Sequence, residues 1–553
     1  MFIDKCITNR NGKTYKRVLI REGKRENGKI VMTTIANLSK RTEEEIEAID
    51  IALKNKDNIA YLKQLAEGKF ENGKKVGAVT LLYQIASRLG ITKALGNSRE
   101  GLLILWLTLA RLIDKGSRLS AVRMAESRVV CEILGLDSFQ EEDFYQAMDW
   151  LYSHREEIEK KLFKNWQKSH IHHQTDQIFL YDVSSSYLEG EQNELAAWGY
   201  NRDKKKGKKQ IVYGLLTDEK GEPLGVEVFQ GNTKDNKTVK EQINKLRNKF
   251  HCRHITFVGD KGMLKIPQIE ELSDENFHYI TTITKDQIQT LLKSGTLQMT
   301  LFDEELGEVE DKKKHIRYVF RRNPYRAEKI RRNRNEKIEK LKEKVLQSNE
   351  YLAAHPKGKM KTQEKKLQQM IIQFKASSYI KLLLDNENRK LEIELDQYSL
   401  EETAKLDGCY VMKTDLPKEL GDKEFIHSRY KSLAEVEWAF RTEKSILGIR
   451  PVYVRKKERT IAHVFIVMLA YKIEKYLRTV WTDMNLTVKE GIDLLESITS
   501  IIITIGDTRL NRIPKPQGTA AELLLRAGVK IPEVLPFCDA VVHTKKKLQD
   551  RRK

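Results

Sequence analysis

Between residues 177 and 285 the hydrophobic pattern takes a strand period, and this stretch limits the folds open to the chain more than any other. Three strand-like segments follow one another, QIFLYDVSSSYLEG, KKQIVYGLLTD and PLGVEVFQGN. A helical segment, TVKEQINKLRNKF, then leads to two further strands, HITFVGD and FHYITTIT. Three successive strands, a crossover helix and a further strand predict a mixed α/β sheet.

Two of these strands end in an aspartate. Asp182 closes the apolar run IFLYD, and Asp260 closes ITFVGD between Gly259 and Gly262. Glycines on both sides leave room for a close approach by backbone or metal. Either aspartate alone is also explained as a turn or helix-start residue, but their matched contexts favour one shared site.

Carboxylates at strand ends suit phosphodiester chemistry. Mg²⁺ prefers oxygen ligands, and two ions roughly 3.5–4 Å apart can hold the attacking and leaving oxygens. We therefore expect two Mg²⁺ ions per site, with Mn²⁺ as a substitute.

A third acid is expected on the helix predicted from about Ser432 to Lys444. At about 100° per residue, one face of this segment carries Tyr430, Leu433, Glu437, Arg441 and Lys444, if the helix begins early enough to include Tyr430. An acid between an aromatic ring and two cations suits a metal site beside DNA. The alternative is a surface helix with a Glu437–Arg441 charge pair.

Tyr430, Glu437 and Lys444 match the spacing of the Tyr-(2)-Arg-(3)-Glu-(6)-Lys signature, and the chain resembles bacterial insertion-sequence transposases of the DDE class, of the cut-and-paste type. The segments AFRTEKSILGIRPVYVR and GKIVMTTIANLSK extend the likeness over most of the chain. The resemblance implies a ribonuclease-H-like core interrupted by an insertion domain, which accounts for the 176 residues between Asp260 and Glu437. It also implies that Asp182, Asp260 and Glu437 bind the metals, that Tyr430 contacts a transposon-end nucleotide, and that Lys444 holds a terminal phosphate.

The chain departs from this family pattern in two places. Leu433 stands where the signature has arginine, so that phosphate contact is missing or moved to Arg429 or Arg441. Residues 286–405 contain no tryptophan to trap a flipped base, and Tyr325 or Phe320 are the candidate substitutes, which leaves excision through a hairpin open.

Charge indicates a polyanionic partner. The chain has 100 Lys and Arg against 79 Asp and Glu, a net charge of +21, which favours nucleic acid over a merely soluble basic protein. Arg321 to Lys375 contributes 17 basic and 6 acidic residues, a local excess of +11, either as a DNA-contacting arm or as a solvated helix. A second basic segment is expected either to track DNA phosphates or to form a solvated hairpin tip; its cations are Arg202, Lys204, Lys205, Lys206, Lys208 and Lys209.

At 553 residues the chain is too long for one core, and we expect an α+β multidomain protein. The predicted parts are a small β-rich region (1–45), a helical domain expected to bind DNA ends (46–175), the core's first part (176–285), a basic insertion domain (286–405), the core's second part (406–485), and a C-terminal candidate for dimerisation (486–553).

Location and metal-binding alternatives follow from small patterns. The five cysteines are far apart and form no C-x-x-C pair, which fits a reducing cytoplasm. The N-terminus lacks a signal-peptide core and the apolar runs are short, so we expect no membrane role. His170, His172 and His173 suit either a metal site or an interdomain surface.

These observations predict a bacterial, nucleoid-associated enzyme that acts on double-stranded DNA, both the inverted-repeat ends of its element and the target, as a homodimer in the synaptic complex. It would cleave the ends and transfer the strands to target DNA. The alternatives are a DNA-binding protein descended from a transposase that has lost catalysis, and a structure-selective nuclease with the same core.

Overall fold

The computed structural model describes residues 1–10, 13–26, 28–58, 68–169, 177–538, 540, 542 and 544. The chain divides into two compact units, a smaller one (1–84, 123–138 and 484–543) and a larger one (85–122, 139–483 and 544–553). The three histidines at 170, 172 and 173 and the tail 545–553 lie outside the described residues. In the described part of the chain, none of the helices has the length and apolar character needed to cross a bilayer.

The larger unit is built on one mixed sheet with the strand order β10-β11-β14-β9-β8-β5-β6-β7. β6 pairs antiparallel with both β5 and β7, whereas β8 runs parallel to β5 and β9 parallel to β8. This arrangement of β5 to β9 is the predicted ribonuclease-H-like core. Its strands are β5 (Gln177–Tyr187), β6 (Gln210–Asp218), β7 (Pro223–Phe229), β8 (Ile255–Gly259) and β9 (His278–Thr282).

Helices cover this sheet because its central strands are apolar on both faces. Phe179 of β5 and Phe257 of β8 are fully buried in one cluster with Phe163 and Leu246, and burying each ring stabilises the fold by about 1.5–3 kcal/mol. Elsewhere α17 packs against β7, α5 and α8. The helices around the sheet are α5 (Arg99–Ile113), α8 (Glu141–Ser169), α9 (Val239–Asn244), α10 (Ile266–Asp274) and α17 (Lys457–Val480).

The sheet continues beyond β9 by three antiparallel strands, β14 (Cys409–Thr414), β11 (Ile316–Arg322) and β10 (Gly307–Asp311). Tyr318, Val319 and Phe320 of β11 are buried, which explains why this segment joins the sheet. Helix α11 (Lys285–Lys293) precedes these strands. Part of the range predicted as an insertion domain therefore contributes strands to the core sheet.

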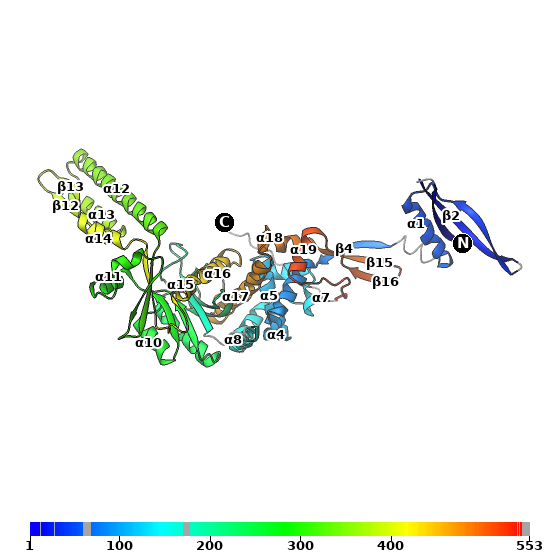
Figure 1. Cartoon of the computed structure of the whole chain (residues 1–553), viewed down its shortest axis with the longest axis horizontal. Coiled ribbons are helices and arrows are strands. Elements are labelled where there is room, and N and C mark those ends of the chain that lie inside the picture. The colour runs from blue at the N-terminus through cyan, green and yellow to red at the C-terminus, as the bar shows by residue number, and fades with distance from the viewer. Residues whose placement is uncertain are drawn as a thin grey trace. The chain divides into compact units, whose positions relative to one another are not determined.

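Residues 323–408 form a separate layer that we call the arm. Figure 1 shows its helices α12 (Pro324–Ala354) and α13 (Met360–Gln373) beside the hairpin of β12 (Ile380–Asp385) and β13 (Lys390–Leu395), followed by α14 (Gln397–Lys405). Leu341, Ile371 and Ile380 form one of its two small apolar cores.

The arm begins and ends at neighbouring backbone positions. Arg322 and Cys409 face each other in the β11–β14 pair, and the Asn323 backbone N–H donates to the Gly408 carbonyl at 2.9 Å. Gly408 has a φ of +74°, and a Cβ there would meet the Asn323 oxygen at 2.4 Å. Just inside the arm, Arg334 of α12 forms a buried ion pair with Asp407. The base of the arm is therefore fixed by both backbone and charge.

The smaller unit contains two antiparallel three-stranded sheets, β1-β2-β3 and β16-β15-β4. The first packs through Val18 and Leu38 against Ile46 of α1, a helix that begins with a Thr42–Glu45 capping box. The elements of the smaller unit are β1 (Phe2–Arg10), β2 (Lys13–Glu26), β3 (Lys29–Asn37), α1 (Glu43–Lys54), β4 (Lys69–Lys75), α7 (Val130–Leu134), α18 (Val488–Leu495), β15 (Thr499–Ile505), β16 (Thr508–Arg512) and α19 (Gly518–Arg526). Two further helices, α3 (Gly77–Arg88) and α6 (Arg118–Glu126), each contain a boundary between the two units, and α4 (Ile91–Leu95) belongs to the larger unit.

Candidate functional site

Asp182 and Asp260 lie on neighbouring parallel strands at the same level. The β5–β8 register pairs Tyr181 with Gly259, so the next residue on each strand is an aspartate. Each carboxylate accepts a hydrogen bond from the backbone N–H of the following residue, Val183 at 2.8 Å and Lys261 at 2.7 Å. The register thus places the two acids on neighbouring strands. Asp260 follows the last residue of β8, as predicted, but β5 continues to Tyr187, so Asp182 lies within its strand and the prediction that it ends the strand is wrong.

The environment of the Asp182 carboxyl disfavours its charged form. Burial raises its pKa to about 7, the Val183 N–H and Arg202 lower the pKa, and the charges of Asp260 and Asp235 raise it further. A carboxylate in this setting is stabilised as an anion when a cation approaches.

The third acid, Glu437, lies on α16 (Leu433–Ser445), and Tyr430 lies near the end of α15 (Lys423–Lys431). The sequence allowed for one helix through both residues, whereas the structure has two helices that meet at Ser432. α16 packs on β5, with Val436, Ala439 and Phe440 buried and Glu437 exposed.

Tyr430 contacts Asp260 and is influenced by the charge of Glu437. Its hydroxyl lies 3.4 Å from Asp260 Oδ1 and 3.0 Å from Thr282 Oγ1. Burial raises the pKa of Tyr430 to about 12, Thr282 lowers it, and the charges of Asp260 and Glu437 raise it. The tyrosine therefore lies within electrostatic reach of two of the three predicted acids.

The donor set at this end of the sheet is all oxygen, which is the ligand type that Mg²⁺ prefers. In the described ranges, however, no three His, Cys, Asp or Glu side chains converge closely enough to hold an ion in this conformation. The desolvated Asp182 and the adjacent Asp260 are the part of the set that fits a divalent cation.

Lys444 forms an ion pair with Asp203, an acid that the sequence analysis did not identify as a site residue. Its Nζ lies 2.9 Å from Asp203 Oδ1, and the Arg450 guanidinium pairs with the same oxygen. Burial lowers the pKa of Lys444, and the bond to Asp203 raises it. Asp203 also accepts from the Tyr187 N–H at 3.2 Å. We call the three charged side chains of Asp203, Lys444 and Arg450 the Asp203 cluster.

The basic segment predicted to follow DNA phosphates is a connection between β5 and β6, and its cations are placed unequally. Lys204 and Lys206 are exposed. Arg202 pairs with Asp235 at 2.6 Å and Lys208 with Glu189 at 2.7 Å. Lys205 lies 5.8 Å from the centre of the Tyr187 ring, and Lys209 is half-buried. Lys205 is exposed as well, so Lys204, Lys205 and Lys206 are the cations of this set that are open to solvent.

The two arginines considered as replacements for Leu433 differ in position. Arg429 pairs with Glu219 at 2.7 Å, whereas Arg441 is exposed and lies 5.3 Å from the centre of the Trp438 ring. Of the two aromatic residues considered in place of a tryptophan, Phe320 is 1% exposed in the β11 core and Tyr325 is 88% exposed. Phe320 is therefore unable to stack on a base in this conformation.

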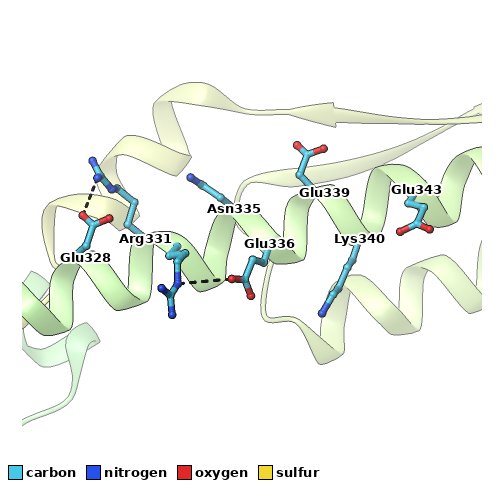
Figure 2. Close-up of a pocket in the computed structure, with 8 residues that line it drawn as sticks. Glu328, Arg331, Asn335, Glu336, Glu339, Lys340 and Glu343 are labelled. Atoms are coloured by element: carbon cyan, nitrogen blue, oxygen red, sulfur yellow. Dashed lines mark ion pairs between the residues drawn. The ribbon is translucent and has the colours of Figure 1, made fainter.

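One exposed face of α12 carries charges of both signs. Figure 2 shows Glu328 paired with Arg331, at 2.7 Å, and a second pair between Arg332 and Glu336, at 3.7 Å. Glu339, Lys340 and Glu343 continue the same face. Pairs spaced by three and four residues are typical of a solvated helix.

Comparisons with known proteins bear on this geometry. A family model described as "Transposase DDE domain" matches residues 173–473, more than half of the chain, and includes all three acids. A second model, "IS1634 family transposase, N-terminal domain", matches residues 3–72.

A comparison with curated proteins found no match. Among solved structures, a piggyBac transposase synaptic complex with hairpin DNA is similar over 72% of this chain and 70% of that chain, at 8% identity and a TM-score of 0.35. That likeness is too low to carry an argument.

Proposed function

The chain belongs to the DDE transposases of insertion sequences, and on that premise we propose that it cleaves the ends of its element with divalent metal ions and joins the freed ends to target DNA. The observation that carries this proposal is the alignment of Asp182 and Asp260 on paired parallel strands, with Tyr430 in contact with Asp260 and influenced by the charge of Glu437.

In this proposal Asp182, Asp260 and Glu437 hold two Mg²⁺ ions, which Mn²⁺ can replace. Bound ions would polarise the phosphodiester and lower the pKa of the attacking water or hydroxyl. The chain's own part is to fix the acids: β5 and β8 set two of them at one level, and the buried face of α16 sets the third.

The partners in the proposal are double-stranded DNA, first the inverted-repeat ends and then the target, and a second copy of the chain in the synaptic complex. Exposed Lys204, Lys206 and Arg441 would meet phosphates around the carboxylates. Such a substrate would place the protein at the bacterial nucleoid.

The test is to incubate the purified chain with a labelled end fragment and Mg²⁺ and to separate nicked, hairpin and joined products. Asp182→Asn, Asp260→Asn and Glu437→Gln should each abolish cleavage and leave end binding largely intact. Two matched controls should cut normally. Glu435→Gln changes a carboxylate of α16 that pairs with Lys475 of α17, and Asp274→Asn changes an exposed aspartate at the end of α10.

Each product pattern has one interpretation. Cut and joined ends support a transposase, and cutting without joining in the presence of target DNA indicates a nuclease. End binding without any cutting by the wild-type chain indicates a protein that has lost catalysis. Near-normal cleavage by any of the three acid variants removes that residue from the site.

A further inference from the structure

The arm contains a hollow of about 510 Å³ between α12, α13 and the loop that joins these two helices. Four lysines line it: Lys344 of α12, Lys357 and Lys359 of the loop, and Lys366 of α13. We call this recess the lysine hollow. None of the described residues that line it is an aspartate or a glutamate. Four cations therefore surround one recess without an acid among them.

The charges of these lysines are not compensated by neighbouring side chains. All four lysines are exposed, and in the part of the chain that the structure describes none of them forms an ion pair. Lys344 donates to the neutral Gln347 Oε1 at 3.1 Å. By contrast, Lys342 on the same helix pairs with Glu339 at 2.9 Å. Like charges that converge on one recess create a positive potential there, which attracts an anion.

The lysine hollow also has a buried polar side chain in its wall. Gln363 of α13 lines the hollow and is only 8% exposed, and its amide forms no hydrogen bond with the described residues. Ser348 of α12, 3% exposed, lines the hollow too and donates to the Lys344 carbonyl at 2.8 Å. A buried amide requires a partner, so a ligand that accepts its N–H groups would be stabilised in the hollow.

The backbone around the hollow is arranged to donate rather than to accept. Arg389, from the turn between β12 and β13, donates to the Pro356 and Gly358 carbonyls, both at 2.8 Å. α13 begins at Met360, and Lys359 provides no side-chain cap. The first N–H groups of a helix have no acceptor within the helix and favour negative charge. Two loop carbonyls are thus occupied by Arg389, while the start of α13 is open to an anion.

The lysine hollow is built entirely from the arm. Lys344 follows Pro324, the first residue of α12, by 20 residues, which is roughly 30 Å along a helix that rises about 1.5 Å per residue. The hollow therefore lies toward the end of α12 that is away from the core sheet (Figure 1). None of its described lining residues belongs to the strands or helices that carry Asp182, Asp260 and Glu437.

We propose that the lysine hollow binds the phosphate groups of a compact polyphosphorylated anion, such as tripolyphosphate or the phosphate chain of a nucleotide. Its volume falls within the roughly 300–1,000 Å³ of small-molecule sites. The lysines neutralise the phosphate charges, and the Gln363 amide and the start of α13 donate to phosphate oxygens. Because Gln363 is recessed, only a group that enters the hollow reaches it, which favours a small anion over the convex surface of a DNA duplex. The site is additional to the proposed cleavage and joining of DNA.

The experiment is calorimetric titration of sodium tripolyphosphate into the full chain without divalent metal. The wild-type chain should bind it saturably, with one molecule per chain. The double change Lys357→Gln and Lys359→Gln should weaken this binding by roughly 10-fold or more, because two charged donors are lost. Gln363→Met keeps the length of the side chain without its N–H groups and should weaken binding by roughly 10-fold.

The matched control is the double change Lys340→Gln and Lys342→Gln. It removes the same charge from exposed positions of α12, but neither lysine lines the lysine hollow, so tripolyphosphate should bind as to the wild type. Circular dichroism checks that each variant keeps its helices. Since Lys357 and Lys359 are exposed, their variant tests the hollow even if Gln363→Met disturbs the packing of α13.

Absence of saturable tripolyphosphate binding by the wild-type chain would overturn the proposal. Equal weakening by the two double changes would also overturn it, because general charge attraction would then explain the binding. A DNA duplex of unrelated sequence separates two sources of phosphate. Tripolyphosphate that still binds the duplex-saturated chain supports a free anion. Displacement by the duplex, with an equal loss of duplex affinity in the Lys357 and Lys359 variant, would assign the hollow to the DNA backbone and overturn a free anion as its ligand.

Discussion

Replacing Asp203 with asparagine tests how the connection between β5 and β6 is held to Lys444 of α16 and to Arg450. The Asp203 side chain is 1% exposed and pairs with Lys444 and Arg450, which are 12% and 33% exposed. Removing one partner of a buried ion pair costs about 3–5 kcal/mol, because the other charge stays buried without compensation. Since Arg450 is one third exposed and water screens it, we expect about 3 kcal/mol, at the lower end of that range.

Urea unfolding followed by intrinsic fluorescence measures this loss. Asp203→Asn should lower the midpoint without changing the slope. The matched control is Glu189→Gln in the same connection, which breaks a pair with Lys208 whose side chains are both 40% exposed; its cost should stay below about 1 kcal/mol. Equal urea midpoints for the two variants would show that the Asp203 cluster does not stabilise the fold more than an exposed ion pair does.

The same variant has an opposite effect on DNA binding. Lys444 and Arg450 lose their anionic partner in Asp203→Asn and become available to phosphates. The dependence of log K on log salt should steepen by about 0.9 for each additional phosphate that the variant neutralises. An unchanged salt dependence together with an unchanged midpoint would leave the cluster without either role.

Three further predictions concern pH and the basic surfaces. Asp182 has a pKa of about 7, raised by burial, so affinity for Mg²⁺ should increase as pH rises through 7 and level off above it; a pH-independent affinity would exclude Asp182 as a ligand. Because the pKa of Asp182 is higher in the folded state than in the unfolded state, the folded protein binds more protons at this group. The free energy of unfolding of the metal-free protein should therefore decrease as pH rises from about 4 to 7. In urea titrations Asp182→Asn should show a smaller decrease over the same range. Changing Lys204 and Lys206 to glutamine should flatten the salt dependence of DNA binding by about 0.9 for each phosphate that is no longer neutralised. The matched double change of Arg331 and Arg332, each already paired within α12, should have a smaller effect, and an equal effect would assign α12 to DNA binding.

The core sheet was predictable because each strand carries its own signal. The apolar runs before Asp182 and Asp260 indicated buried strands, and the helical segment before the second run indicated a crossover, so a mixed α/β sheet could be predicted. The parallel pairing of β5 with β8 comes from the structure. The roles of Asp182, Asp260 and Glu437 in metal binding stay predictions.

The Asp203 cluster was not predictable, because Lys444 and Arg450 lie 241 and 247 residues from Asp203 and no local periodicity links them. Asp203 was visible only as one acid among six cations. The helix predicted from about Ser432 to Lys444 is α16 (Leu433–Ser445), but the separate helix α15 that carries Tyr430 was not predicted. Ser432 between them has helical φ and ψ of −61° and −15°.

The strands at the base of the arm were also missed as part of the sheet. β10 and β11 are short, and their place depends on pairing with β14, which follows the whole arm in the chain. The charged helix α12 dominates the composition of this range, and the whole of 286–405 was therefore predicted as an insertion domain.

The junction at Asn323 and Gly408 gives the arm an unusual freedom to change. Because β11 and β14 are antiparallel neighbours at that point, the arm occupies the place of a hairpin turn, and the two strands would remain in register around a loop of almost any length. Insertions, deletions or replacement of the whole arm can therefore accumulate there without disturbing the order of the core strands. The arm can diverge in size and surface between relatives while Asp182 and Asp260 keep their positions.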